Sequence, residues 1–204
     1  MHWRSIPVKS KTESQCLAAL AFAVGVFTCS GAYASQTIVC IGDSNFGAPG
    51  VSRSEAYPAQ LEAALRAKGL DVTVTNAGKN GDTTQGVMSR MDSDVPNGTA
   101  LAIISVGIND VVLNHDSPGA VKARVDQIAQ HLKFRGIKVL VLPTGKDFQG
   151  SIAGDPKYHV EANGRTDVHG PAPGTTKWHL TGPGYAIVVA RTLPQVIAAL
   201  KSVK

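Results

Sequence analysis

The chain has 204 residues, of which 43% are hydrophobic and 17% are charged, so it has enough apolar material for one globular domain with an ordinary core. Its formal net charge of +5 is small and scattered along the chain. A nucleic-acid-binding protein normally gathers its basic residues on one face, so the charge argues against a nucleic-acid partner.

The N-terminal segment has the pattern of a secretory signal peptide. A basic stretch at residues 4–11 precedes an uncharged apolar run at Cys16–Cys29, and Ala32-Tyr33-Ala34 then forms a small-residue cleavage site. The sequence therefore predicts a signal peptide over residues 1–34, cleaved after Ala34, and a mature domain over residues 35–204 that is periplasmic or secreted. The apolar run is shorter than the roughly 20 residues of a transmembrane helix. An uncleaved N-terminal membrane anchor is the alternative, and after cleavage no stable membrane insertion is expected.

Loss of the leader also changes the charge and cysteine content. Residues 1–34 hold three of the 20 basic and one of the 15 acidic residues, so the mature chain carries a net charge of +3. Only Cys40 of the three cysteines remains, in the middle of an apolar run. An exported domain with one cysteine has no intramolecular disulfide, so its hydrophobic core must stabilise it alone.

Strand and helix patterns alternate after the leader. Short apolar runs, mostly β-branched, predict buried parallel strands at Thr37–Ile41, Asp71–Thr75, Leu101–Val106 and Lys138–Leu142. Helical periodicity and end signals predict helices at Glu55–Lys68, Thr84–Met91, Ser117–Gly136 and Pro183–Ser202. This alternation predicts a three-layer αβα sandwich. Its centre is a doubly wound, flavodoxin-like parallel sheet of four to five strands in the order 2-1-3-4-(5).

The segment from Pro143 to Trp178 is rich in glycine and proline and has no clear periodicity. Only Lys157–Ala162 resembles a short edge strand. A structureless segment of this length in a compact domain is uncommon unless it is functional. We therefore expect it to form the variable wall of a substrate cleft.

Small polar clusters follow the first three predicted strands, at Gly42–Asn45, Gly78–Asp82 and Gly107–Asp110. Taken singly, each is also typical of an ordinary turn, cap or surface loop. The predicted strand order places all three on one rim of the sheet, with Ser44 beside the point where the winding reverses. A fourth cluster, Trp178-His179-Leu180, precedes the last predicted helix. If His179 reaches the same rim, the rim holds a serine, hydrogen-bond donors and an imidazole. These groups are the minimum for acyl transfer through a serine nucleophile.

The four clusters resemble the sequence blocks of the SGNH (GDSL) hydrolase family. The run from Tyr57 to Gln85 is most similar to its bacterial thioesterase I/lysophospholipase and arylesterase branch, because Tyr57-Pro58 begins a helix and Asn76-Ala77-Gly78 leads into Gly81-Asp82-Thr83-Thr84. The similarity covers roughly residues 37–200, although it is thin between residues 144 and 176. The resemblance implies the SGNH hydrolase fold.

The resemblance also implies roles for individual residues. Ser44 is the nucleophile and His179 is the general base. The oxyanion hole consists of the backbone N–H groups of Ser44 and Gly81 and the side-chain amide of Asn109. Asp43 and Asp110 are expected to support their loops.

One departure from the family pattern concerns the orienting acid, which normally lies three residues before the histidine. Thr176 occupies that position here. Asp167 could supply the acid from another direction, or the Thr176 hydroxyl and a backbone carbonyl could orient the ring of a Ser–His dyad. Alternatively, catalysis has been lost. In a second departure, Asn45 stands where this branch usually has leucine, which should alter the floor of the cleft.

The remaining histidines give no ligand pattern. His159 and His169 lie near acidic residues, but their spacing matches no regular metal site, so neither a metal nor a cofactor is expected. The sequence thus predicts a serine esterase, thioesterase or lipase-like hydrolase that acts on an acyl ester, a lipid or an acylated glycan. The alternatives are an O-deacetylase of carbohydrate or cell-wall polymers and a catalytically silent binding module.

Overall fold

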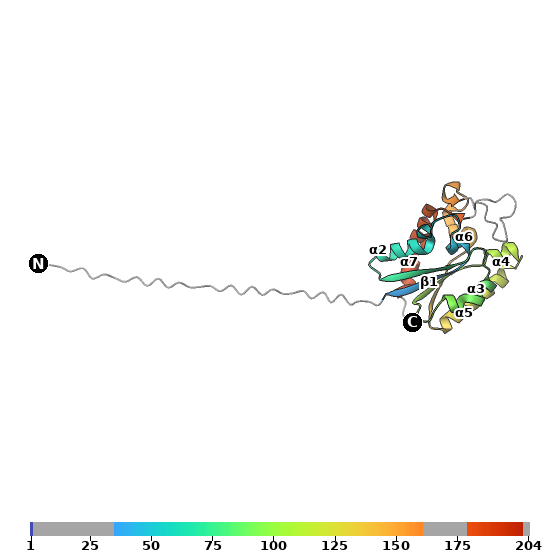
Figure 1. Ribbon diagram of the computed structural model, residues 1–204, viewed down its shortest axis with the longest axis horizontal. Coiled ribbons are helices and arrows are strands. Elements are labelled where there is room, and N and C mark those ends of the chain that lie inside the picture. Colours follow the sequence, from blue (N-terminus) through green and yellow to red (C-terminus); the bar gives the residue numbers. More distant parts are fainter. Residues whose placement is uncertain (2–34, 161–178, 202–204) are drawn as a thin grey trace. The chain divides into compact units, whose positions relative to one another are not determined.

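The computed structural model describes Met1, residues 35–160 and residues 179–201 (Figure 1). The chain divides into two units, residues 1–32 and residues 33–204, and the elements below belong to the second. Residues 2–34 of the predicted signal peptide lie outside the described residues, as do Asp167 and Thr176.

A parallel sheet forms the centre of the domain. Its strands pair in the order β2-β1-β3-β4, which confirms the predicted α/β fold and strand order. The strands are β1 (Gln36–Gly42), β2 (Val72–Gly78), β3 (Leu101–Ser105) and β4 (Lys138–Val141). Within the described ranges this sheet has no fifth strand. The expected edge strand at Lys157–Ala162 is instead the two-residue β5 (His159–Val160), which pairs in antiparallel fashion with β6 (His179–Leu180) in a separate ribbon.

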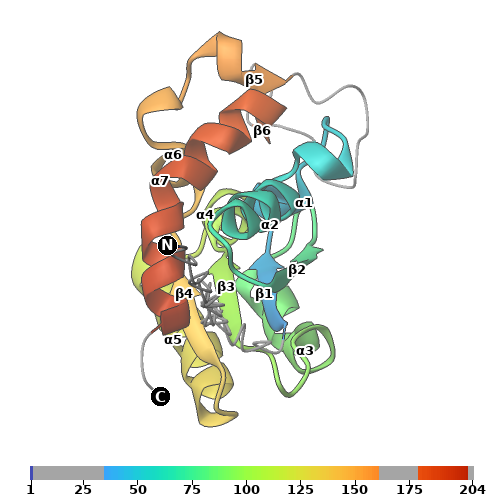
Figure 2. The same cartoon turned by 90° about the vertical axis from the view of Figure 1, so that its left-hand side faces the viewer.

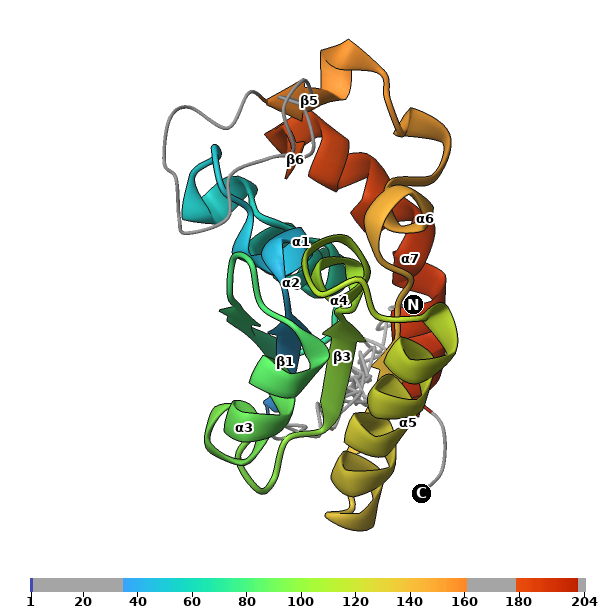
Figure 3. The same ribbon diagram turned by 90° about the vertical axis from the view of Figure 1, so that its right-hand side faces the viewer.

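Helices cover both faces of the sheet, as Figures 2 and 3 show. α2 (Tyr57–Ala67) and α7 (Gly182–Lys201) pack on one face, and α3 (Thr84–Asp94) and α5 (Pro118–Phe134) on the other. Side chains alternate across the sheet accordingly. In β1, Ile38 and Cys40 join the core under α2 and α7, and Val39 and Ile41 join the core under α3 and α5.

Local signals explain where the main helices begin. Ser117 and Thr83 accept hydrogen bonds through their hydroxyl oxygens from Ala120 N (3.3 Å) and Gly86 N (3.2 Å), and so cap α5 and α3. Thr181 likewise accepts from Gly184 N (3.2 Å) at the start of α7. Ser117 lies at a predicted helix start, Thr83 lies one residue before one, and Thr181 lies two residues before one.

Three strands end in a single row. Gly42 at the end of β1 pairs in register with Gly78 of β2 and with Ser105 of β3. The chains approach so closely here that a Cβ at position 42 would clash with the carbonyl oxygen of Ser105, so only glycine fits. The loops that follow these three strands therefore leave the sheet side by side on the predicted rim.

The structure corrects the expectation of an irregular segment after residue 143. This region contains α6 (Gly145–Gln149), the 3₁₀ turns at Gly150–Ile152 and Pro156–Tyr158, and β5. Two further short helices, α1 (Ser44–Gly47) and α4 (Ile108–Leu113), were also not predicted. All three helices have six residues or fewer, too few for a helical period to show in the sequence.

α7 is the one helix of the described chain that is long and apolar enough to cross a membrane. Its apolar face is buried within the domain, where Tyr185, Val188 and Val196 belong to the core under the sheet. Its composition is therefore explained by packing against α2 and the sheet.

Candidate active site

Ser44 is the first residue of α1, immediately after β1. Asp43 precedes it as the N-cap, and the Asp43 carboxylate accepts a hydrogen bond from Asn45 N (2.9 Å). Phe46 anchors the helix, because its ring is fully buried between two other aromatic rings. The centroid of the Phe46 ring lies 5.3 Å from that of Tyr57 and 6.1 Å from that of Phe148. The serine thus lies on a fixed strand-to-helix turn at the carboxyl end of the sheet.

Asp43 is buried, and it forms no ion pair with a cationic side chain of the described residues. Burial raises its pKa to about 7, and the nearby carboxylates of Asp82 and Asp110 add to the rise, whereas hydrogen bonds from Asn45 N and Thr144 oppose it. The Thr144 hydroxyl donates to Asp43 Oδ2 over 3.4 Å. Asp43 therefore places a buried carboxyl group on the residue immediately before the proposed nucleophile.

Asn45 points into the domain rather than serving only as cleft lining. Its Nδ2 atom donates to Ser105 Oγ (3.0 Å) and to Thr144 Oγ1 (3.2 Å), and Ser105 Oγ in turn donates to the carbonyl oxygen of Pro143 (2.8 Å). A leucine at this position could make none of these bonds. The departure from the family pattern at Asn45 thus creates a polar link between α1 and the loop after β4.

The loop after β2 supplies the second cluster. Lys79 N donates to the carbonyl oxygen of Gly42 (2.9 Å), and Asp82 N donates back to that of Lys79 (3.1 Å), which closes a tight turn. Gly81 within this turn has a φ of +75°, a conformation that favours glycine. Among the described residues, the Gly81 N–H has no hydrogen-bond partner, so it is available to a ligand.

Asn109 lies beside this turn. Its Nδ2 atom donates to the carbonyl oxygen of Asp82 (2.7 Å), which leaves one of its two N–H bonds for another acceptor. The structure therefore brings Gly81 and Asn109, the two predicted donors outside the nucleophile's own loop, to the same place.

Asp110 fixes the loop that carries Asn109. Its carboxylate is buried and accepts hydrogen bonds from Thr84 N (2.9 Å), from the Thr84 hydroxyl and from Arg124 Nη2 (3.1 Å). Arg124 also forms an ion pair with Asp116. This cluster joins the start of α3, α4 and α5.

Arg90 of α3 connects the first two clusters, a role that the sequence did not reveal. Its guanidinium donates to the carbonyl oxygens of Gly42 (3.0 Å) and Ala77 (2.9 Å), at the ends of β1 and β2. It also donates to the carboxylates of Asp82 (2.8 Å) and Asp94 (2.6 Å). One side chain thus binds two strand ends and the turn that contains Gly81.

His179 is held by the β5–β6 ribbon, where it pairs with Val160. Burial lowers its pKa, and the nearby His159 lowers it further. Its Nδ1 atom is buried and has no hydrogen-bond partner within the described part of the chain. Nδ1 is the nitrogen that an orienting acid contacts in a Ser–His–acid triad when Nε2 faces the serine.

His159, which the sequence did not assign to the site, is buried beside His179. Its Nδ1 and Nε2 atoms lie 2.6 Å from the carbonyl oxygen of Asp155 and 3.1 Å from Gln149 Oε1. It thus ties the ribbon to the segment after α6.

The structure unites three of the four clusters through hydrogen bonds, but it shows no such bond between Ser44 and His179. The described residues offer no hydrogen-bond partner to Ser44 Oγ. Figures 2 and 3 show β6 beyond the carboxyl ends of the strands, at the same end of the sheet as α1. Burial raises the pKa of Tyr185, in the first turn of α7, and the charge of Asp43 adds to the rise.

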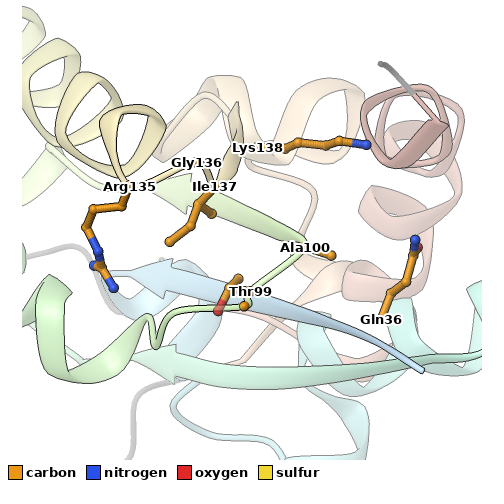
Figure 4. Close-up of a pocket in the computed structure, with 8 residues that line it drawn as sticks. Gln36, Thr99, Ala100, Arg135, Gly136, Ile137 and Lys138 are labelled. Atoms are coloured by element: carbon orange, nitrogen blue, oxygen red, sulfur yellow. The ribbon is translucent and has the colours of Figure 1, made fainter. Parts of the chain in front are cut away.

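Other kinds of site are not evident in the described chain. No group of three or more potential metal-ligating side chains occurs there. A cavity of about 290 Å³ lies at the opposite end of the sheet, where β1 and β4 begin (Figure 4). The cationic groups that line it are already engaged, because Arg135 pairs with Asp92 and Lys138 donates to the carbonyl oxygen of Leu200.

Comparisons with known proteins agree with this arrangement. The model of the GDSL-like Lipase/Acylhydrolase family matches residues 40–173. Esterase TesA of Pseudomonas aeruginosa is 34% identical over 110 residues, and the match spans about half of each protein, 53% of this chain and 54% of the relative.

Solved structures extend the similarity over most of the chain. A crystal structure of TesA has a TM-score of 0.61 and 25% identity, with 80% of this chain and 99% of that one covered. AlinE4, a SGNH-hydrolase family esterase, has a TM-score of 0.53 and 26% identity, with 82% and 98% covered. The predicted family resemblance and fold are thereby confirmed.

Proposed function

This chain belongs to the GDSL-like lipase/acylhydrolase family, and on that premise we propose that it is a serine hydrolase that cleaves carboxylic ester or thioester bonds through an acyl-enzyme. The observation that carries the proposal is the meeting of three loops at one rim. Ser44 begins a helix there, and the N–H of Gly81, which has no partner among the described residues, lies in a turn that is bonded to Asn109. The names of the esterase relatives agree with this chemistry.

In the proposed reaction, Ser44 Oγ attacks the acyl carbonyl carbon and His179 takes the hydroxyl proton. The N–H groups of Ser44, Gly81 and Asn109 donate to the oxygen as it becomes negative. Each such donor typically contributes on the order of 3 kcal/mol to lowering the barrier. His179 then gives its proton to the leaving alcohol or thiol, and water releases the acid by the same steps in reverse. No step needs a metal or cofactor.

The burial of His179 has two opposite effects on this mechanism. Its buried position favours the neutral imidazole that a general base requires, but it also disfavours the imidazolium that forms in the transition state. Loss of the orienting acid from a triad costs about 10⁴-fold in turnover. Asp167, or the Thr176 hydroxyl with a backbone carbonyl, remains a candidate for this role, and both residues lie outside the described ranges.

Thr176 at the position of the usual acid, together with a His179 Nδ1 that has no partner among the described residues, also favours a second candidate function, a catalytically silent module that uses the same cleft to bind an acylated ligand. Such a module would retain the fold and the polar rim without turnover. Binding of the ligand would then be indifferent to loss of the Ser44 hydroxyl.

The two candidates are separated by assaying wild type and Ser44→Ala on nitrophenyl esters of rising chain length, together with labelling by a fluorophosphonate. Ser89→Ala is the matched control, because Ser89 is exposed on α3 and its hydroxyl donates only to the carbonyl oxygen of Gly86. We expect wild type and Ser89→Ala to hydrolyse esters and take up the label, and Ser44→Ala to do neither. A wild type that binds an acylated ligand without hydrolysis or labelling would select the silent module. Acetate release from acetylated glycans would identify a deacetylase.

Export completes the proposal. Residues 1–34 act as a signal peptide, and residues 35–204 work in the periplasm or outside the cell on an acyl ester, a lipid or an acylated glycan. N-terminal sequencing of the exported protein should begin at Ser35. A chain that stays in the membrane with Met1 intact would identify an N-terminal anchor instead.

A further inference from the structure

We propose that the Asn80–Gly81 peptide is a site of spontaneous deamidation, and that this reaction disables the oxyanion hole. The deamidation reaction depends only on the geometry of the turn that contains Asn80 and Gly81. The loss of activity rests on the function proposed above.

Both reacting groups are accessible. Asn80 and Gly81 are exposed, and among the described residues neither the Asn80 carboxamide nor the Gly81 N–H has a hydrogen-bond partner. Gly81 has no side chain to hinder an approach to its nitrogen, and an added Cβ would meet no atom within 4 Å. An asparagine followed by glycine is the pair in which the main-chain nitrogen most easily reaches the side-chain carbonyl carbon.

The reaction balances with water alone. The Gly81 nitrogen gives up its proton and attacks Asn80 Cγ, a C–N bond forms, and the Asn80 amide leaves as ammonia. Water then opens the resulting succinimide. Opening at the side-chain carbonyl gives aspartate, whereas opening at the main-chain carbonyl gives isoaspartate.

The nucleophile in this reaction is the same atom that we assign to the oxyanion hole. Isoaspartate adds a methylene group to the main chain directly before Gly81, so the Gly81 N–H can no longer hold its position beside Asn109. Aspartate leaves the chain length unchanged but puts a negative charge next to the oxyanion. Loss of one oxyanion donor lowers kcat by about 10²–10³-fold.

The chain contains a matched internal reference at Asn97–Gly98. This pair is also exposed, and Gly98 has a φ of +89°, compared with +75° for Gly81. The difference is that Asn97 Oδ1 accepts a hydrogen bond from Arg135 Nη2 (3.0 Å). Because that bond holds the Asn97 carboxamide in one orientation, and the side chain must turn to bring Cγ to the Gly98 nitrogen, we expect Asn97 to react roughly tenfold more slowly than Asn80.

The test is to incubate the folded protein at mildly alkaline pH and to follow residues 80 and 97 by peptide mass mapping, with digestion at mildly acidic pH. Isoaspartate is detected by enzymatic methylation. A third pair, Asn163–Gly164, lies outside the described residues, so the starting protein carries Asn163→Gln. We expect Asn80 to deamidate faster than Asn97. Esterase activity should fall in proportion to the amount of isoaspartate formed at position 80.

Substitution variants and prior labelling of Ser44 provide two further tests of the proposal. Asn80→Gln should abolish the decline of activity with time, whatever its starting activity, whereas Asn97→Gln should leave the decline unchanged. Prior labelling of Ser44 with a fluorophosphonate should slow conversion at Asn80, because the phosphonyl oxygen would accept the Gly81 N–H. Equal or faster conversion at Asn97, or full activity after conversion at Asn80, would overturn the proposal. The mass readout remains valid even if the protein proves not to be an esterase.

Discussion

Arg90→Lys tests whether a single side chain aligns the catalytic loops. Arg90 donates to the carbonyl oxygens of Gly42 and Ala77 and to the carboxylates of Asp82 and Asp94. Lysine keeps the positive charge, but its compact ammonium cannot span two strand ends and the turn as a planar guanidinium does.

The structure sets the size of the expected effect. The Arg90 side chain is 17% exposed and that of Asp82 is 8% exposed, so the groups that lose a partner are poorly hydrated. Hydrogen bonds to a charged group contribute roughly 1.5–3 kcal/mol each. Loss of the two carbonyl contacts should therefore lower the free energy of unfolding by about 3–6 kcal/mol. Since the Gly81 turn is displaced rather than deleted, kcat should fall about 10-fold to 10²-fold, less than for removal of an oxyanion donor.

The assay pairs urea unfolding with kcat and KM on one nitrophenyl ester. Arg66→Lys is the control, because Arg66 also donates to a strand carbonyl, that of Val72 (2.9 Å), and pairs with Glu62, but at the start of β2. We expect Arg66→Lys to leave kcat unchanged. If Arg90→Lys matches wild type in both unfolding and kcat, the reasoning that Arg90 organises the rim is wrong.

Two predictions concern pH. Because burial raises the pKa of Asp43 from 3.8 to about 7, the folded state binds more protons than the unfolded state in that range, and stability should fall by on the order of 4 kcal/mol as pH rises through it. Asp43→Asn should remove most of this dependence in urea unfolding at a series of pH values, and an unchanged slope would show that Asp43 titrates normally. Because burial lowers the pKa of His179, the acidic limb of kcat/KM should have its midpoint below the ordinary value of 6.5. Thr176→Asp, at the position of the usual acid, should move that midpoint upward and raise kcat; a profile identical to that of wild type would mean that His179 is oriented by another group.

The sheet and its rim could be predicted because each signal is local. Four apolar runs, helix caps such as Ser117 and the strand-end glycines determine the element order, and general rules for parallel sheets then give the arrangement of strands and loops. The positions of Ser44, Gly81 and Asn109 at one rim follow from that arrangement.

The supporting contacts could not be predicted in the same way. Arg90 donates to backbone carbonyl groups 13 and 48 residues away. Every residue has such a group, so the sequence does not show which of them accept a hydrogen bond. His159 was considered only as a metal ligand, because nothing in the spacing indicates that its strand pairs with the strand of His179. The short helices α1 and α4 were missed because their positions depend on packing by residues such as Phe46 and on the buried Asp110 network.

The row formed by Gly42, Gly78 and Ser105 restricts which insertions and deletions this protein could accept during evolution. Main-chain pairing holds the proposed chemical groups in place, so the crossover connections at the far end of the sheet are free to lengthen or shorten without moving them. A single residue inserted within β1 would have a different outcome, because side chains alternate across a strand. Every later residue of β1 would turn to the opposite face, and the turn that carries Ser44 would be displaced. New substrate preferences should therefore arise through changes in the segments that surround the rim, while the spacing within β1 stays constant.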